Sequence, residues 1–205
     1  DTYGVSLAAL GTLLGALRFI DVVQDPVLGW ISERLNKGKA FWVSFGAFVL
    51  AISMVGLFAV NPPISPIWWF AITITGLFSA FSFLTINFYA QGVMKVGDDD
   101  SGHVKLAAWR ETGALLGVCI AAVAPTVLMG FTDNPFSIFA YGFVTVTALA
   151  TLYMWPEWHG RTETEPSQIK EIFRDNLARK LLILALVNAT PLAVSCAEAS
   201  TRRLY

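Results

Sequence analysis

Long apolar stretches alternate with short polar breaks along the chain. Five stretches are rich enough in apolar residues and long enough to cross a bilayer, which takes about 20 residues as a helix. Lipid offers the backbone no hydrogen-bond partner, so each stretch is expected to be helical. They cover residues 4–33, 41–60, 67–96, 104–129 and 136–155, and a sixth begins near Lys180.

Turn-forming residues occupy the breaks: NKGK at 36–39, NPPISP at 61–66, VGDDDSGH at 96–103 and FTDNP at 131–135. A longer polar stretch follows Trp155, and its IKEIFRDNLARK portion predicts a short amphipathic helix at the membrane surface. The pattern therefore predicts an all-α membrane protein. We expect about five full transmembrane helices and the start of a sixth.

The composition indicates a protein embedded in lipid and argues against a nucleic-acid partner. Hydrophobic residues make up 55% of the chain and charged residues 14%, which is far to the apolar side of a soluble domain. The net charge of -1 gives no basic field for nucleic acid. The lipid bilayer is the expected partner, and nucleic acid is not.

The distribution of Lys and Arg predicts the orientation. Three basic residues, Arg34, Lys37 and Lys39, lie between the first two spans and five between positions 161 and 180, whereas 61–66 and 131–135 have none. Basic residues gather in cytoplasmic loops. We therefore expect Asp1 outside and the loop 156–179 in the cytoplasm.

Three charged residues stand within the first apolar stretch. Arg18, Asp21 and Asp25 are spaced i, i+3 and i+7, so one face of a helix carries all three near the middle of the membrane. A lone charge at that depth costs on the order of 2.5 to 3.5 kcal/mol even on a lenient scale, so these charges must face a cavity or one another.

Asp21 and Asp25 present carboxylate oxygens to one volume, which suits a small hard cation or shared protons. A bound cation, a proton or Arg18 would relieve their repulsion. Pro26 removes one backbone hydrogen bond and frees a carbonyl near Val22 that could help coordinate. The alternative is a structural ion-pair network that holds helices together.

A second polar cluster contains Arg110 and Glu111 in the fourth stretch. Arg110 could contact a substrate, or it could reach the interface and pair with an acid there. Polar residues of the third stretch, such as Asn87 and Gln91, could bind a solute or join helices. An intramembrane enzyme is not indicated, because both histidines lie in polar loops and no HExxH or GxSxG motif is present.

The segment RFIDVVQDPVLGWISER, residues 18–34, resembles the second transmembrane helix of the glycoside-pentoside-hexuronide:cation symporters. This is the melibiose-permease-like branch of the major facilitator superfamily. The loop NKGKAFW continues the pattern, and INFYAQGV and LAAWRETGALLG are similar to the fourth and fifth helices of the family.

The resemblance implies a role for individual residues. The cation, sodium or a proton, would be bound by Asp21 and Asp25, with Gln24 beside them and a hydroxyl from Ser82; sodium would be the metal ligated by the two aspartates. The substrate would contact Arg18, Tyr89, Arg110 and Thr85. Thr85 takes the place of the acidic sugar-binding residue of the family, which is a departure in the substrate site. No cofactor beyond the coupling ion is implied.

The resemblance also implies the organisation of the chain. The family fold has twelve helices in two halves. Residues 1–155 would be a partial N-terminal bundle containing helices two to six, 156–179 the central cytoplasmic loop, and 180–205 the truncated start of the second bundle. The first helix is expected to be missing, and the apolar run ends early, at Cys196.

The implied function is cation-coupled secondary transport of a sugar, glycoside or related small solute across a bacterial inner membrane, by a chain present as a fragment. The alternative is a non-transporting membrane fragment or scaffold with structural buried ion pairs.

Overall fold

Four long helices follow one another in the described part of a computed structural model, namely residues 11, 24–32, 34, 38–97, 99–159, 176, 180 and 184. They are α2 (Lys39–Phe58), α3 (Pro66–Val96), α4 (Asp100–Leu128) and α5 (Pro135–Met154), and a short 3-10 helix, η1, covers Trp155–His159. Residues 24–32 are also helical. The four predicted stretches after residue 40 therefore coincide with helices, and the all-α prediction is confirmed. Most of the stretch 4–23 and of the sixth stretch lies outside the described residues.

Local sequence explains where these helices begin and end. Gly38 before α2 and Gly97 after α3 have φ angles of 86° and 62°, a left-handed region that glycine enters without a steric penalty. Pro66 and Pro135 open α3 and α5, where the missing N–H costs no hydrogen bond. Asp99 caps α4 by accepting a hydrogen bond from the Ser101 N–H.

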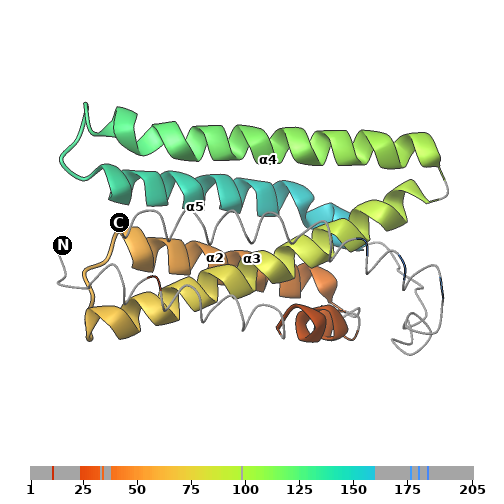
Figure 1. The fold of residues 1–205 in the computed structure, drawn as a ribbon, viewed down its shortest axis with the longest axis horizontal. Helices are drawn as coiled ribbons and strands as arrows, with labels where there is room; N and C mark the ends of the chain where they lie inside the picture. The colour runs from red at the N-terminus through yellow and green to blue at the C-terminus, as the bar shows by residue number, and fades with distance from the viewer. Residues whose placement is uncertain are drawn as a thin grey trace. The chain divides into compact units, whose positions relative to one another are not determined.

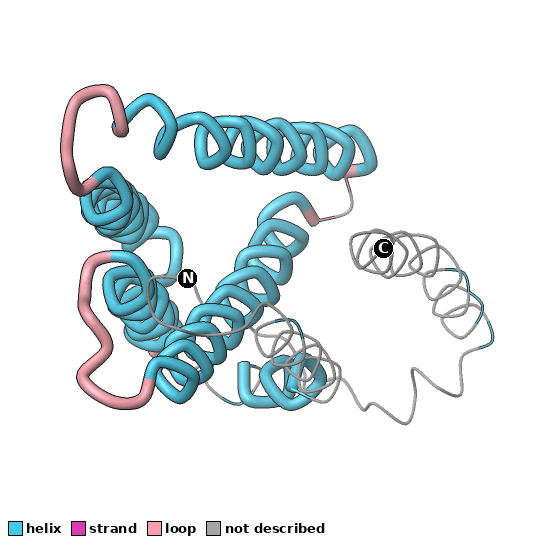
Figure 2. Tube along the Cα trace, turned by 60° about the vertical axis from the view of Figure 1, so that its left-hand side comes forward, coloured by secondary structure: helices cyan, strands magenta, loops and turns pink. Residues whose placement is uncertain are grey.

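Helix α2 is the centre of the described bundle. It packs against both α3 and α5, and α4 packs mainly along α5, while α3 and α4 diverge from their connection (Figures 1 and 2). Small and branched side chains let α2 and α3 approach. The core cluster consists of Ala40, Val43, Ala47, Leu50, Ala80, Leu84 and Trp158.

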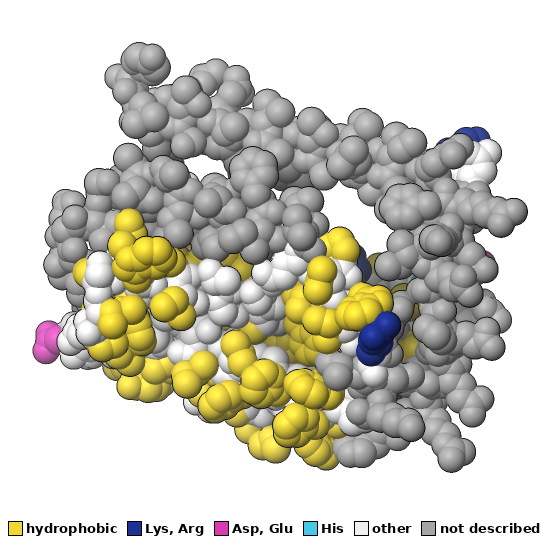
Figure 3. Space-filling view, turned by 90° about the horizontal axis from the view of Figure 1, so that it is seen from below, with side chains coloured by type: hydrophobic (Ala, Val, Ile, Leu, Met, Phe, Trp, Pro, Cys, Tyr) yellow, Lys and Arg dark blue, Asp and Glu magenta, His cyan; other side chains and the backbone are white. Residues whose placement is uncertain are grey.

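The outer surfaces of the helices are apolar. Helix α4 has no buried residue, and large hydrophobic side chains such as Leu115, Val118 and Ile120 are more than half exposed. Hydrophobic side chains also cover much of the described part of the face in Figure 3. All four helices are long and apolar enough to cross a membrane. Exposed apolar surface of this extent indicates a lipid-facing protein.

Residues just after α5 fold back onto the bundle. Helix η1 contacts α2 and α5, and Trp158 is 6% exposed, with its ring 5.3 Å from that of Phe88. The sequence placed these residues at the start of a polar loop. Contacts divide the chain after Arg161, into residues 1–161 and 162–205.

Candidate functional site

The clearest polar contact between the apolar helical segments joins Asp25 and Ser82. The Ser82 hydroxyl donates a hydrogen bond of 2.5 Å to Asp25 Oδ1, linking the helical segment 24–32 to α3. The carboxylate is exposed and Ser82 is half-buried. The structure therefore brings together two of the oxygen donors that the resemblance assigned to a cation site.

The other residues of that predicted cation site are only partly described. Gln24 precedes Asp25 in the same helix and is half-buried. Arg18 and Asp21 lie outside the described residues, so their roles stay predictions. Among the residues that the structure describes, no three Asp, Glu, His or Cys side chains gather in a metal-binding cluster.

A second, buried contact fixes the same two helices. The Ser32 hydroxyl donates to Asn87 Oδ1 at 2.8 Å, and the Asn87 amide donates to the Phe83 carbonyl at 2.7 Å. Asn87 is 1% exposed. Since Asp25 pairs with Ser82 and Ser32 with Asn87, the two segments run in the same direction, and this bond holds their register.

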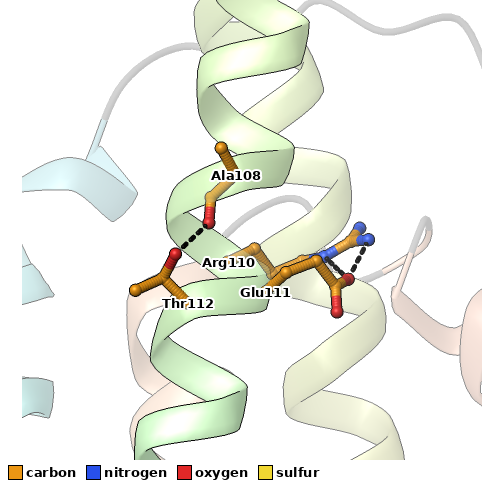
Figure 4. A network of polar contacts seen from close by, with 4 residues as sticks. All are labelled: Ala108, Arg110, Glu111 and Thr112. Atoms are coloured by element: carbon orange, nitrogen blue, oxygen red, sulfur yellow. Dashed lines mark hydrogen bonds and ion pairs between the residues drawn. The ribbon is translucent and has the colours of Figure 1, made fainter.

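The predicted substrate residues Tyr89 and Arg110 also meet. The Arg110 guanidinium carbon lies 4.6 Å from the centre of the Tyr89 ring, which joins α3 to α4. Arg110 Nε and Nη2 donate to Glu111 Oε1 at 3.1 and 2.7 Å. Figure 4 shows these two side chains together on α4, with Thr112 directed elsewhere and bonded to the Ala108 carbonyl.

The predicted site residues of α3 lie along one stripe of the helix. Ser82, Thr85 and Tyr89 are spaced i, i+3 and i+7, so they share a face. Two turns, roughly 10 Å of helix axis, separate Ser82 beside Asp25 from Tyr89 beside Arg110. Thr85 lies between them and is half-buried. One helix face thus connects the predicted cation oxygens with the predicted substrate residues.

Two contacting groups were not found from the sequence. Ser32 is seven residues after Asp25, and that spacing on one helix face was the available signal. The Glu157 carboxylate accepts a hydrogen bond of 2.5 Å from Lys95 Nζ. The Glu157 backbone carbonyl accepts one of 2.9 Å from Gln91 Nε2. Nothing in the local pattern around 157 indicates that it folds back onto α3.

The arrangement suits binding rather than bond-making chemistry. Carboxylate and hydroxyl oxygens are ligands for hard cations or protons. A guanidinium offers up to five donors, and a neighbouring aromatic face adds apolar contact. Together these groups could hold an oxygen-rich solute.

Comparison with known proteins identifies the family. A sequence model described as MFS/sugar transport protein matches residues 1–200. The chain belongs to this family. The resemblance to major facilitator sugar symporters is confirmed at the level of the family, which is one of sugar transport proteins.

A curated relative supports the assignment. The "Inner membrane symporter YicJ" of Escherichia coli (strain K12) is 27% identical over 163 residues, which are 75% of this chain. Those residues are 35% of the relative, so the chain spans about a third of its length. No solved structure matches the chain. The described residues form four helices that are long and apolar enough to cross a membrane, and together with the family this makes the chain an integral membrane protein.

Proposed function

We propose that this chain forms the cation-binding part of a symporter that carries a small sugar-type solute across a bacterial inner membrane. Sodium or a proton would bind at Asp25 and Ser82, together with Asp21 and Gln24. The solute would contact Tyr89 and Arg110, with Thr85 and Arg18 nearby. The contact between Ser82 and Asp25 carries the proposal, because it joins oxygen donors from two apolar helical segments.

The geometry supports coupling between the two ligands. Ser82 and Tyr89 belong to one rigid helix face, so a cation that draws Ser82 and Asp25 together also biases the position of Tyr89. A ligand shifts a conformational equilibrium only by its differential affinity for the two states. A cation that binds better to the solute-competent position of α3 would therefore raise solute affinity, and the reverse holds by reciprocity.

Sodium-dependent stabilisation of the purified chain in detergent tests the cation site. Sodium that binds only the folded chain must raise its stability, by about 2.7 kcal/mol at a concentration 100 times the dissociation constant. We expect the parent to be stabilised and Asp21→Asn with Asp25→Asn to be insensitive. Asp133→Asn is the matched control, because Asp133 lies in the exposed connection between α4 and α5 and should leave the response intact.

The other outcomes of this experiment are also informative. If sodium has no effect but mild acid changes the stability of the parent alone, protons are the coupling ion. If neither has an effect, the charges are structural, as expected of a non-transporting membrane segment.

A further inference from the structure

An apolar hollow of about 220 Å³ lies between the segment 24–32, α2 and α3, and its lining includes none of Asp25, Ser82, Tyr89 and Arg110. The side chains around it come from all three elements and include Leu28, Ile31, Trp42, Phe45, Ser79 and Phe83. Gly46 is also at its wall, where a Cβ atom would stand 3.0 Å from the Phe83 ring. The absence of a side chain there keeps the hollow open.

Two basic residues follow or precede the lining residues of this hollow by one helical turn. Lys39, Trp42 and Gly46 are spaced i, i+3 and i+7 on α2, so Lys39 lies one turn beyond the lining on the same stripe. Arg34 lies one turn beyond Ile31, with its guanidinium 3.8 Å over the exposed Trp30 ring. The connection between these two residues carries a further lysine in its sequence, Lys37.

Lys39 is buried without a counter-charge among the residues that the structure describes. The residue is 9% exposed, and its ammonium lies 5.9 Å from the Trp158 ring, with no carboxylate of the described residues at ion-pair distance. A buried ammonium is costly unless an anion pairs with it. A ring face at nearly 6 Å offsets only a small part of that cost.

We propose that this hollow and Lys39 form a binding site for an anionic phospholipid. An acyl chain would occupy the apolar hollow, and the phosphate would pair with Lys39 and Arg34 at the end of the helices. Both halves of the site match the ligand, because basic residues beside a membrane surface attract anionic head groups and the hollow offers apolar contact to the tail. The site is separate from Asp25 and Ser82, so its test does not depend on transport.

The first measurement is thermal stability of the purified chain in detergent micelles, titrated with dioleoylphosphatidylglycerol or with zwitterionic dioleoylphosphatidylcholine. We expect phosphatidylglycerol to raise the midpoint by roughly 5 °C at saturation, and phosphatidylcholine to raise it much less. Glycerol phosphate, which has no tail, should have no effect. If glycerol phosphate alone raised the thermal midpoint as much as phosphatidylglycerol, the acyl chain would not contribute to binding, and the proposed lipid site would be wrong.

Two variants address the two halves of the site. Lys39→Met keeps the apolar stem and removes the charge, and should weaken phosphatidylglycerol binding about fivefold. Ser79→Leu fills the hollow and should weaken both lipids together. The matched controls are Lys105→Met, an exposed basic residue at the start of α4, and Ser44→Leu, which fills a different hollow between α2 and α5. Equal losses in the controls would overturn the site in favour of a diffuse charge effect.

A spectroscopic measurement covers the case in which Lys39→Met fails to fold. Phosphatidylglycerol with brominated acyl chains quenches tryptophan at contact, and the share due to Trp42 is the difference between the parent and Trp42→Phe. We expect brominated phosphatidylglycerol to quench Trp42 at least twice as strongly as brominated phosphatidylcholine does. Arg34→Gln should reduce this difference between the two lipids. Equal quenching by the two lipids would overturn the proposal.

Discussion

The Ser82 hydroxyl lies 2.5 Å from the Asp25 carboxylate although 57 residues separate them in the chain. The same face of α3 reaches Arg110 of α4 through Tyr89, seven residues later. A buried hydrogen bond from Ser32 to Asn87 fixes the register between α3 and the segment that carries Asp25. Helix α3 therefore links the helical segment 24–32, which carries Asp25, to the helix with Arg110, and its contacts can be tested one at a time.

Removing the Ser82 hydroxyl should weaken sodium binding without abolishing it. Ser82→Ala takes away one neutral oxygen donor and leaves Asp25 in place, so we expect roughly a tenfold loss of apparent sodium affinity, measured by thermal shift. Ser137→Ala is the control, because its hydroxyl bonds the backbone carbonyl of Phe58 at the C-terminal end of α2. Unchanged sodium affinity in Ser82→Ala would show that this hydroxyl is not a ligand.

The buried amide of Asn87 should contribute to stability through Ser32. Asn87→Ala leaves the Ser32 hydroxyl without this partner and opens a small space, and should cost about 1 to 2 kcal/mol in unfolding free energy. A double-mutant cycle with Ser32→Ala should give a coupling of about 0.6 to 1.7 kcal/mol.

The control for Asn87 is Thr112→Ala. The Thr112 hydroxyl is exposed and bonds the Ala108 carbonyl of its own helix, so we expect a change within about 0.5 kcal/mol. An effect of Asn87→Ala no larger than that of Thr112→Ala would contradict the role given to the buried bond.

The ring of Tyr89 should be coupled to the charge of Arg110. Both side chains are about half exposed, so the interaction should be worth about 0.5 to 1 kcal/mol. A cycle of Tyr89→Leu and Arg110→Gln, followed by unfolding, measures it. Tyr89→Phe keeps the aromatic ring and should retain the coupling. A coupling energy of zero in the cycle with Tyr89→Leu would show that the contact between the two side chains does not contribute to stability.

Hydrophobic patterning was sufficient to predict the helices, because a lipid solvent demands long apolar helices with turn residues between them. The predicted start and end of each helix differ from α2, α3, α4 and α5 by at most four residues. The polar ends account for the differences. Helix α4, for example, begins at Asp100 because Asp99 caps it, whereas the apolar pattern begins at Val104.

Pairing between helices was predicted less completely. Ser82 was placed beside Asp25 through the family resemblance, since periodicity assigns a residue to a face but not to a partner. Glu157 and Trp158 were missed because their contacts with Gln91, Lys95 and Phe88 depend on the turn after α5. Such long-range contacts are set by the packed bundle, which leaves no periodic signal in a five-residue segment.

Burial of Trp158 should make the short η1 helix important for stability. Trp158→Ala removes a core side chain and should cost about 3 to 5 kcal/mol in unfolding free energy, while Glu157→Gln should cost less than about 1 kcal/mol because its pair with Lys95 is exposed. Trp68→Ala is the control, since Trp68 is 67% exposed and away from the core. Similar losses at Trp68 and Trp158 would contradict the packing of η1.

The cap of α4 should make stability depend on pH. The hydrogen bond from Ser101 is the main reason that the pKa of Asp99 lies below its ordinary value of 3.8. A lowered folded-state pKa means that the contribution is fully present above 3.8 and is lost as the pH falls through the folded-state value. Asp99 lies outside the membrane-spanning helices, so solvent protons reach it.

Two variants separate the charge of Asp99 from its capping oxygen. Asp99→Asn keeps an acceptor suited to an N-cap but does not titrate, whereas Asp99→Ala removes the cap at every pH. We expect the parent to be more stable than Asp99→Asn at neutral pH, since the carboxylate also favours the helix N-terminus, and this difference to shrink below pH 3.8. Thermal unfolding between neutral and acidic pH measures it. A difference between parent and Asp99→Asn that stays constant over this range would show that the carboxylate charge plays no part in capping α4.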